Sequence, residues 1–107
     1  MAFLALASQK SLLTLQKNFL QFQLVSISNQ IHIATSQMAE IEREYADQDC
    51  TEDAGYIYYK NLEDQLDTEK DSVESQITAI ENEISGLKTL VNNNIKSSCT
   101  LNLASGG

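Results

Sequence analysis

One acidic stretch before the middle of the chain, YADQDCTEDAG, holds side chains that could bind a cation. Read as a calcium loop, it places Asp47, Asp49 and Thr51 at the first three ligand positions. Glu52 then stands where the sharp turn of such a loop needs glycine, and Tyr58 stands where the bidentate glutamate belongs. These mismatches argue against calcium, and we expect the stretch to form a bend with no metal site.

Other signals of catalysis are missing from the sequence. It contains no phosphate-binding loop, no zinc-ligand spacing and no glycine-rich nucleotide fingerprint. The adjacent carboxylates Glu63 and Asp64, and the pair Glu81 and Glu83, would need a sheltered cleft for acid–base work. We therefore expect no enzyme, no cofactor and no small-molecule substrate.

The composition indicates a few long helices in place of a compact globule. The 107 residues include three Phe, four Tyr, no Trp, no Pro and four Gly, two of which end the chain. A globule of this size needs a larger aromatic and aliphatic core, and many short elements need turn residues at each corner. A chain rich in Leu, Ile, Gln and Glu with few breakers favours long helices.

Apolar residues recur at steps of three and four in both halves, which is typical of the heptad seam of a coiled coil. The seam of the first half contains Leu13, Leu20, Leu24, Ile27, Ile31, Ala34, Met38, Ile41 and Tyr45. The seam of the second half contains Leu62, Leu66, Val73, Ile77, Ile80, Ile84, Leu87 and Val91. Two matching seams predict helices that pack against each other.

The expected fold is all-α: a long antiparallel two-helix coiled-coil hairpin that assembles into a helical oligomer. Helix one covers residues 3–46, the bend 47–55, helix two 56–97, and a C-terminal tail 98–107. Thr51 and Asp53 are candidates for capping the start of helix two.

In this hairpin Cys50 lies at the bend and Cys99 near the chain ends, whereas a disulfide needs Cα atoms within about 7 Å. We expect no disulfide within one chain, although a bridge between neighbouring subunits stays open. His32 falls in mid-helix, away from both thiols, and is expected at a surface or interface. Of the three tyrosines after the bend, two are expected to cover the end of the seam.

Helix one carries a further apolar row, the second stripe, made of Leu12, Leu15, Phe19 and Phe22. It lies roughly a third of a turn from the seam, so one partner helix cannot cover both. Helix two has no matching row, and exposed apolar surface of this kind promotes association. We expect the second stripe to be an oligomer interface.

Charge is unevenly distributed along the chain. Residues 1–39 contain two lysines and no acid, residues 40–83 contain all fifteen acids and three bases, and residues 84–107 contain two lysines. In the hairpin the acids gather around the bend, which argues against nucleic-acid binding there. The weakly basic, apolar segments meet at the end that carries the termini.

The apolar start MAFLALAS has no basic residue before it and is too short for a secretory leader, so we expect no cleaved leader. No stretch approaches the roughly 20 apolar residues that a membrane span needs. The second stripe could rest on a membrane surface, but few basic residues are available to hold anionic lipids.

In layout the chain resembles the small helical-hairpin subunits of type III secretion needles and, more loosely, the terminal coiled coils of flagellar axial proteins. The resemblance includes the start MAFLALASQKSLLTLQKN and the end LVNNNIKSSCTLNL. Needle subunits carry a proline in the turn, whereas this chain has none. The resemblance implies termini packed toward the core of a helical tube, and export to the cell surface without a cleaved leader.

These observations predict a non-enzymatic structural protein that associates with itself. Its protomers would form an extracellular or cell-surface filament or tube, with termini inward and acidic bends outward. The alternative is a soluble, cytoplasmic coiled-coil adaptor or chaperone-like protein that binds a different partner through the second stripe.

Overall fold

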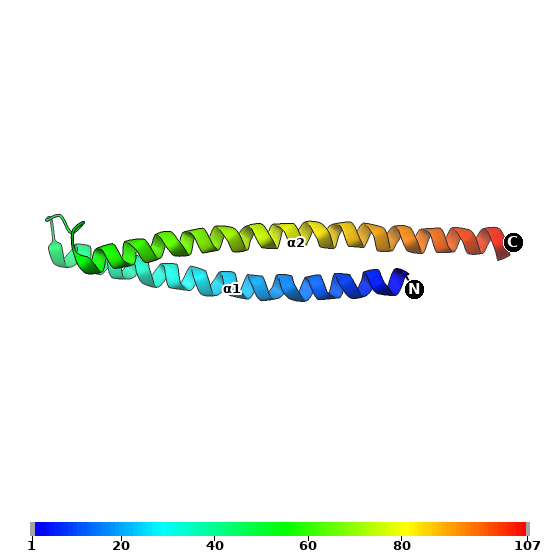
Figure 1. The fold of residues 1–107 in the computed structure, drawn as a ribbon, viewed down its shortest axis with the longest axis horizontal. Helices are drawn as coiled ribbons and strands as arrows, with labels where there is room; N and C mark the ends of the chain where they lie inside the picture. Colours follow the sequence, from blue (N-terminus) through cyan, green and yellow to red (C-terminus); the bar gives the residue numbers. More distant parts are fainter. Residues whose placement is uncertain (1, 107) are drawn as a thin grey trace. The chain divides into compact units, whose positions relative to one another are not determined.

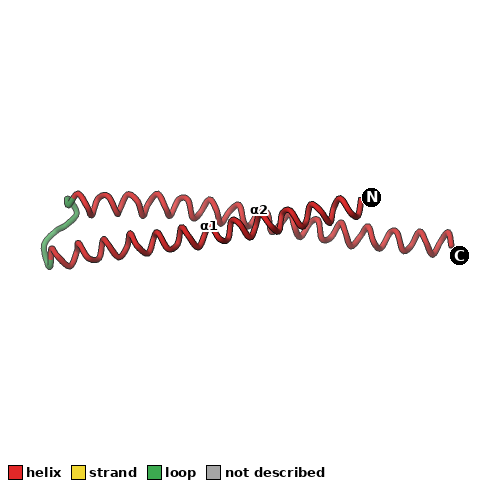
Figure 2. Tube along the Cα trace, turned by 90° about the horizontal axis from the view of Figure 1, so that it is seen from below, coloured by secondary structure: helices red, strands yellow, loops and turns green. Residues whose placement is uncertain are grey.

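Two long helices joined by a short loop make up the part of the chain that the structure describes (Figure 1). The computed structural model describes the backbone of residues 2–106 and the side chains of residues 5–93. Helix α1 is Ala2–Tyr45 and helix α2 is Ala54–Gly106. Figure 2 shows the loop between them in green. The fold is the all-α helical hairpin that the sequence predicts.

The hairpin divides into two compact units. The loop unit is Gln21–Ser75 and contains the end of α1, the loop and the start of α2. The terminal unit combines Met1–Leu20 with Gln76–Gly107. Each unit therefore contains one segment from each helix.

Helix α2 extends beyond its expected end. We expected it to stop at residue 97 and to be followed by a tail over 98–107, but the helix continues to Gly106. Residues 98–105 contain neither proline nor glycine, so nothing in them interrupts the ladder of backbone hydrogen bonds. The expected bend over 47–55 is likewise shorter, because the helices leave only residues 46–53 between them.

The end of α1 is fixed by a left-handed residue. Ala46 has a φ of 54°, and its backbone N–H donates to the carbonyl of Arg43 at 3.2 Å. The next turn is closed by the N–H of Gln48, which donates to the carbonyl of Tyr45 at 3.0 Å. Helices commonly end with such a residue, although glycine adopts the conformation at lower cost than alanine.

The start of α2 is capped by Asp53, as the sequence suggested. Its Oδ1 accepts a hydrogen bond from the backbone N–H of Tyr56 at 2.9 Å, which satisfies one of the free donors of the first turn. Its Oδ2 accepts a hydrogen bond from the hydroxyl of Tyr45 at 2.8 Å. A side chain on Gly55 would lie 3.1 Å from Asp53 Oδ1 and 3.3 Å from Ile41 Cδ1. The glycine therefore leaves room for the cap.

The loop unit has a closed core. Its buried apolar side chains are Ile27, Ala34, Met38, Cys50, Leu66 and Val73. On each helix the buried seam positions recur at heptad spacing, as in coiled-coil packing. Between the helices, the hydroxyl of Thr35 donates to Glu63 Oε2 at 3.2 Å. Within this unit the two helices therefore bury the middle of each other's seam.

Candidate functional site

The second stripe is exposed in the folded hairpin. Leu12 is 57% exposed, Leu15 65% and Phe19 68% in the terminal unit. Phe22, which follows on the same helix in the loop unit, is 77% exposed. Helix α2 leaves these four side chains in solvent, and their role as an oligomer interface stays a prediction.

Four further exposed apolar residues were not singled out from the sequence, and one of them is Ile57 at the start of α2, which is 43% exposed. Val25 and Ile33 of α1 are 58% and 61% exposed in the loop unit, and Leu90 of α2 is 52% exposed in the terminal unit. Val25 comes three residues after Phe22, which is a helical step that could have revealed it. Leu90 likewise comes three residues after the seam residue Leu87.

The core of the terminal unit is less complete than that of the loop unit. Among its described side chains only Ile77 is buried. Its other predicted seam residues, Leu13, Leu20, Ile80, Ile84, Leu87 and Val91, are all half-buried. In the loop unit half of the predicted seam is buried, and the half-buried members are Leu24, Ile31, Ile41, Tyr45 and Leu62. Two helices alone do not close this part of the seam.

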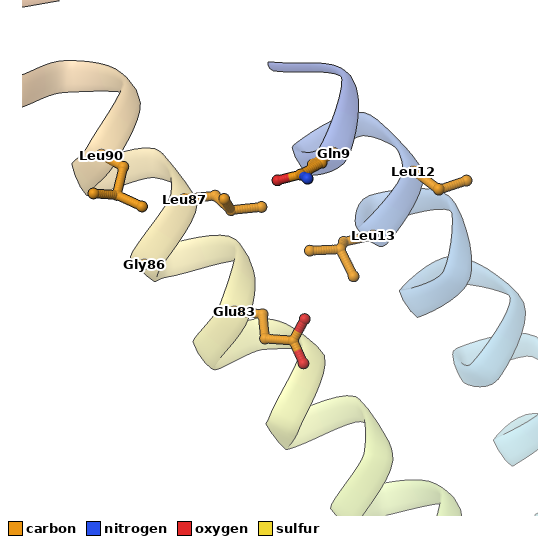
Figure 3. Close-up of a pocket in the computed structure, with 7 residues that line it drawn as sticks. All are labelled: Gln9, Leu12, Leu13, Glu83, Gly86, Leu87 and Leu90. Atoms are coloured by element: carbon orange, nitrogen blue, oxygen red, sulfur yellow. The ribbon is translucent and has the colours of Figure 1, made fainter. Parts of the chain in front are cut away.

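A hollow of about 460 Å³ opens between the helix segments of the terminal unit (Figure 3). It is lined by Gln9, Leu12, Leu13, Glu83, Gly86, Leu87 and Leu90. Figure 3 shows Leu13 and Leu87 facing each other across the hollow, and Leu12 pointing away from α2. The lining is apolar apart from one amide and one carboxylate.

A second hollow of about 450 Å³ is lined by Leu15, Gln16, Phe19, Leu20, Gln76 and Ile80. Gln9, Leu12, Gln16 and Phe19 are spaced by three and four residues, so the two hollows share one flank of α1. The residues from α2 follow the same period. We call this pair of hollows the lateral groove; the stripe residues Leu12, Leu15 and Phe19 form its outer wall.

Gly86 lies in the lateral groove with open space around it. A Cβ at this position would meet no atom within 4 Å other than those of its chain neighbours and of the nearby backbone of α2. Because the hairpin itself does not require a glycine there, packing inside one chain gives no reason for it.

The two units differ strongly in charge. The loop unit contains thirteen acids and three bases, for a net charge of −10. The terminal unit contains four lysines and two glutamates, for a net charge of +2. Like units of two molecules would therefore repel strongly through the loop unit and only weakly through the terminal unit.

No protein-family model matches this chain, and no curated protein or solved structure matches it. Within the described residues, neither helix combines the length and the apolar character needed to cross a bilayer.

The acidic residues of the loop make turns and caps. Asp49 Oδ1 accepts a hydrogen bond from the backbone N–H of Thr51 at 3.0 Å, and this bond lowers the pKa of Asp49. The pKa of Asp53 is lowered by the backbone N–H of Tyr56 and by the Tyr45 hydroxyl. Both carboxylates thus have local partners, which suits the bend that the sequence predicts.

One carboxylate cluster adds Asp67 to the pair Glu63 and Asp64 that the sequence indicated. Glu63, Asp64 and Asp67 each place one carboxylate oxygen within 4.8 Å of the others on α2. Lys60 Nζ lies 3.5 Å from Glu63 Oε1 and 3.4 Å from Asp64 Oδ1, and the charge of Asp64 raises the pKa of Lys60. The lysine partly neutralises this largely exposed cluster, and we assign it no ligand.

The thiol of Cys50 is buried in the loop, and burial raises its pKa above the usual value. A raised pKa makes a cysteine a weak nucleophile at neutral pH. His32 is exposed on α1. The side chain of Cys99 lies outside the described residues, so the expectation about a disulfide stays a prediction.

The three tyrosines after the loop differ in exposure. Tyr56 and Tyr59 are half-buried, whereas Tyr58 is 62% exposed. The rings of Tyr58 and Tyr59 meet edge to face, with centroids 5.1 Å apart.

Proposed function

We propose that this protein is a non-enzymatic structural subunit that associates with copies of itself through its terminal unit. The observation that carries the proposal is the exposure of the second stripe, where Leu12, Leu15 and Phe19 each leave more than half of their surface in water. Burying an exposed leucine or phenylalanine side chain contributes about 1.5–3 kcal/mol. Three such residues in each copy supply a strong drive to associate.

The incomplete core of the terminal unit supports the same proposal. A third or fourth helix laid along the lateral groove would cover both the half-buried seam residues and the stripe, as in a helical bundle. The uncharged Gln and Ser residues around the stripe can enter an interface without the desolvation cost of an ion.

In the proposed assembly, charge determines which unit faces outward. Loop units with a net charge of −10 repel one another and separate, while terminal units with +2 can approach. Repetition of this arrangement gives a helical filament or tube with the loop units on the outside. The proposal includes a cell-surface location, which the resemblance to needle subunits implies; a cytoplasmic location is the alternative.

Light scattering and negative-stain microscopy of the purified chain test the proposal. We expect polymers for the wild type and dispersed chains for the double variant Phe19→Asp/Phe22→Asp. The helical circular dichroism should stay largely intact, because both rings are exposed in the hairpin. Asn18→Asp/Gln21→Asp is the matched control, because it adds two charges at the same spacing on exposed positions outside the stripe.

A wild-type chain that stays monomeric at high concentration contradicts the proposal. Small oligomers that form only with a second protein would instead favour the coiled-coil adaptor. Loss of helicity in the double variant, with none in the control, would mean that the two rings stabilise the monomer.

A further inference from the structure

We propose that the lateral groove beside Gly86 is the binding site for helix α1 of a second copy, whose Leu15 and Phe19 pack next to the glycine. This inference rests on the proposed function and names the surface that receives the stripe.

The first argument is the cost of Gly86. A glycine inside a helix destabilises it by about 1 kcal/mol relative to alanine. In many proteins such a glycine allows another backbone or a ligand to come close. Here, apart from its chain neighbours and the nearby backbone of its own helix, no atom lies within 4 Å of where the first side-chain carbon would be. The open space next to Leu87 and Leu90 is therefore available to a group from outside the chain.

The second argument is charge complementarity. Glu83 is the one charged residue that lines the two hollows of the groove. Residues 1–39 contain Lys10 and Lys17 and no acid, so an incoming α1 brings only positive charge near the stripe. Residues 40–83 hold every acid of the chain and would place further carboxylates against Glu83. Residues 84–107 also carry lysines and no acid, but of these two acid-free segments only residues 1–39 contain the exposed second stripe, which selects the first part of α1 as the occupant.

The third argument is a column of glutamines along α1. Gln9, Gln16, Gln23 and Gln30 recur every seven residues, and the first two line the groove. An amide side chain both donates and accepts hydrogen bonds, so it can pair with an identical side chain of another copy. Such self-complementary surfaces are what contacts between like subunits require.

The test fills the groove with Gly86→Leu, and Ser85→Leu is the matched control. Ser85 is exposed on α2, and its neighbouring position on the helix turns it away from the groove. We expect Gly86→Leu to raise the concentration needed for assembly by about tenfold or more, which corresponds to about 1.4 kcal/mol. Ser85→Leu should assemble at nearly the wild-type concentration.

The milder change Gly86→Ala should stabilise the dispersed hairpin but weaken assembly. In the Phe19→Asp/Phe22→Asp background it should raise the thermal midpoint of the dispersed hairpin, because alanine favours the helix. In the otherwise wild-type chain it should weaken assembly. A merely tolerated glycine would give the first effect without the second, and that result overturns the inference.

Disulfide trapping identifies the occupant. Cys50→Ser/Cys99→Ser chains carrying Gly86→Cys are mixed with the same background carrying Leu15→Cys and oxidised. We expect cross-linked pairs that contain one chain of each kind, and few when Ser85→Cys replaces Gly86→Cys. Equal cross-linking yields from Gly86→Cys and Ser85→Cys contradict the proposed binding site.

These outcomes separate the two proposals. If Phe19→Asp/Phe22→Asp disperses the polymers but Gly86→Leu assembles like the wild type, the binding site beside Gly86 is wrong and the proposed structural function stands. If the wild-type chain does not assemble, both are wrong.

Discussion

The hydroxyl of Tyr45, the last residue of α1, donates a 2.8 Å hydrogen bond to Asp53 Oδ2, directly before α2. The other carboxylate oxygen of Asp53 caps α2 through the backbone N–H of Tyr56. One side chain therefore joins the two helix ends across the loop. The two hydrogen bonds stabilise the charged carboxylate and so lower the pKa of Asp53. The bond to Asp53 also raises the pKa of Tyr45.

The first prediction concerns Asp53→Asn and acid. Because the pKa of Asp53 is lowered in the folded chain, its stabilising effect is present above the unfolded pKa of about 3.9 and is lost as the pH falls through the folded value. We expect the thermal midpoint of the variant to change less than that of the wild type as the pH falls from about 5 to about 2.5. Asparagine retains the cap, so the neutral-pH midpoint should fall by only about a few degrees.

Circular dichroism melts in the dispersed Phe19→Asp/Phe22→Asp background provide the measurement. Asp67→Asn, which removes an exposed carboxylate elsewhere on α2, is the control for a lost charge. An identical pH dependence in wild type and Asp53→Asn would show that the cap does not couple to protonation.

The second prediction concerns Ala46→Gly. Ala46 ends α1 with a φ of 54°, a conformation that glycine adopts without steric cost. We expect the substitution to stabilise the hairpin by about 0.5–1 kcal/mol, even though glycine usually destabilises a chain. Urea unfolding followed at 222 nm measures the change. Ala39→Gly, at an exposed position inside α1, should destabilise instead.

The third prediction compares cores of the two units. Leu66 is 4% exposed in the loop unit, and Leu66→Ala should cost about 2–5 kcal/mol in the dispersed background. Leu87 is half-buried in the terminal unit, so Leu87→Ala should cost less than about 2 kcal/mol there. Hydrogen exchange should likewise show slower amide exchange in the loop unit. Equal costs would contradict the incomplete core of the terminal unit.

The fourth prediction concerns salt. Screening shortens from about 30 Å at 0.01 M salt to about 3 Å at 1 M, which weakens repulsion between loop units. We expect salt to lower the concentration needed for assembly. Asp67→Asn/Glu69→Gln/Asp71→Asn, which neutralises three exposed acids of the loop unit, should assemble more readily at low salt and respond less to added salt. Assemblies that dissolve in salt would instead indicate contacts between terminal and loop units.

The sequence alone determined the helical hairpin, because heptad spacing and the lack of breakers leave few other ways to bury these side chains. It also separated two apolar faces of α1, since helical periodicity fixes the direction of every side chain on a straight helix. Asp53 was recognisable as a cap from its type and place before α2. The end of α2 was not, because residues 98–105 carry neither a breaker nor a strong apolar period.

Only the tertiary structure decided how completely each part of the seam is closed. Burial depends on how near the second helix comes and on which flanking side chains reach across, and the spacing of apolar residues contains neither quantity. For this reason Ile27 and Leu66 are buried while Leu20 and Leu87 are half-buried, although all four are seam residues. The open space at Gly86 has the same origin, because it depends on atoms that are distant in sequence.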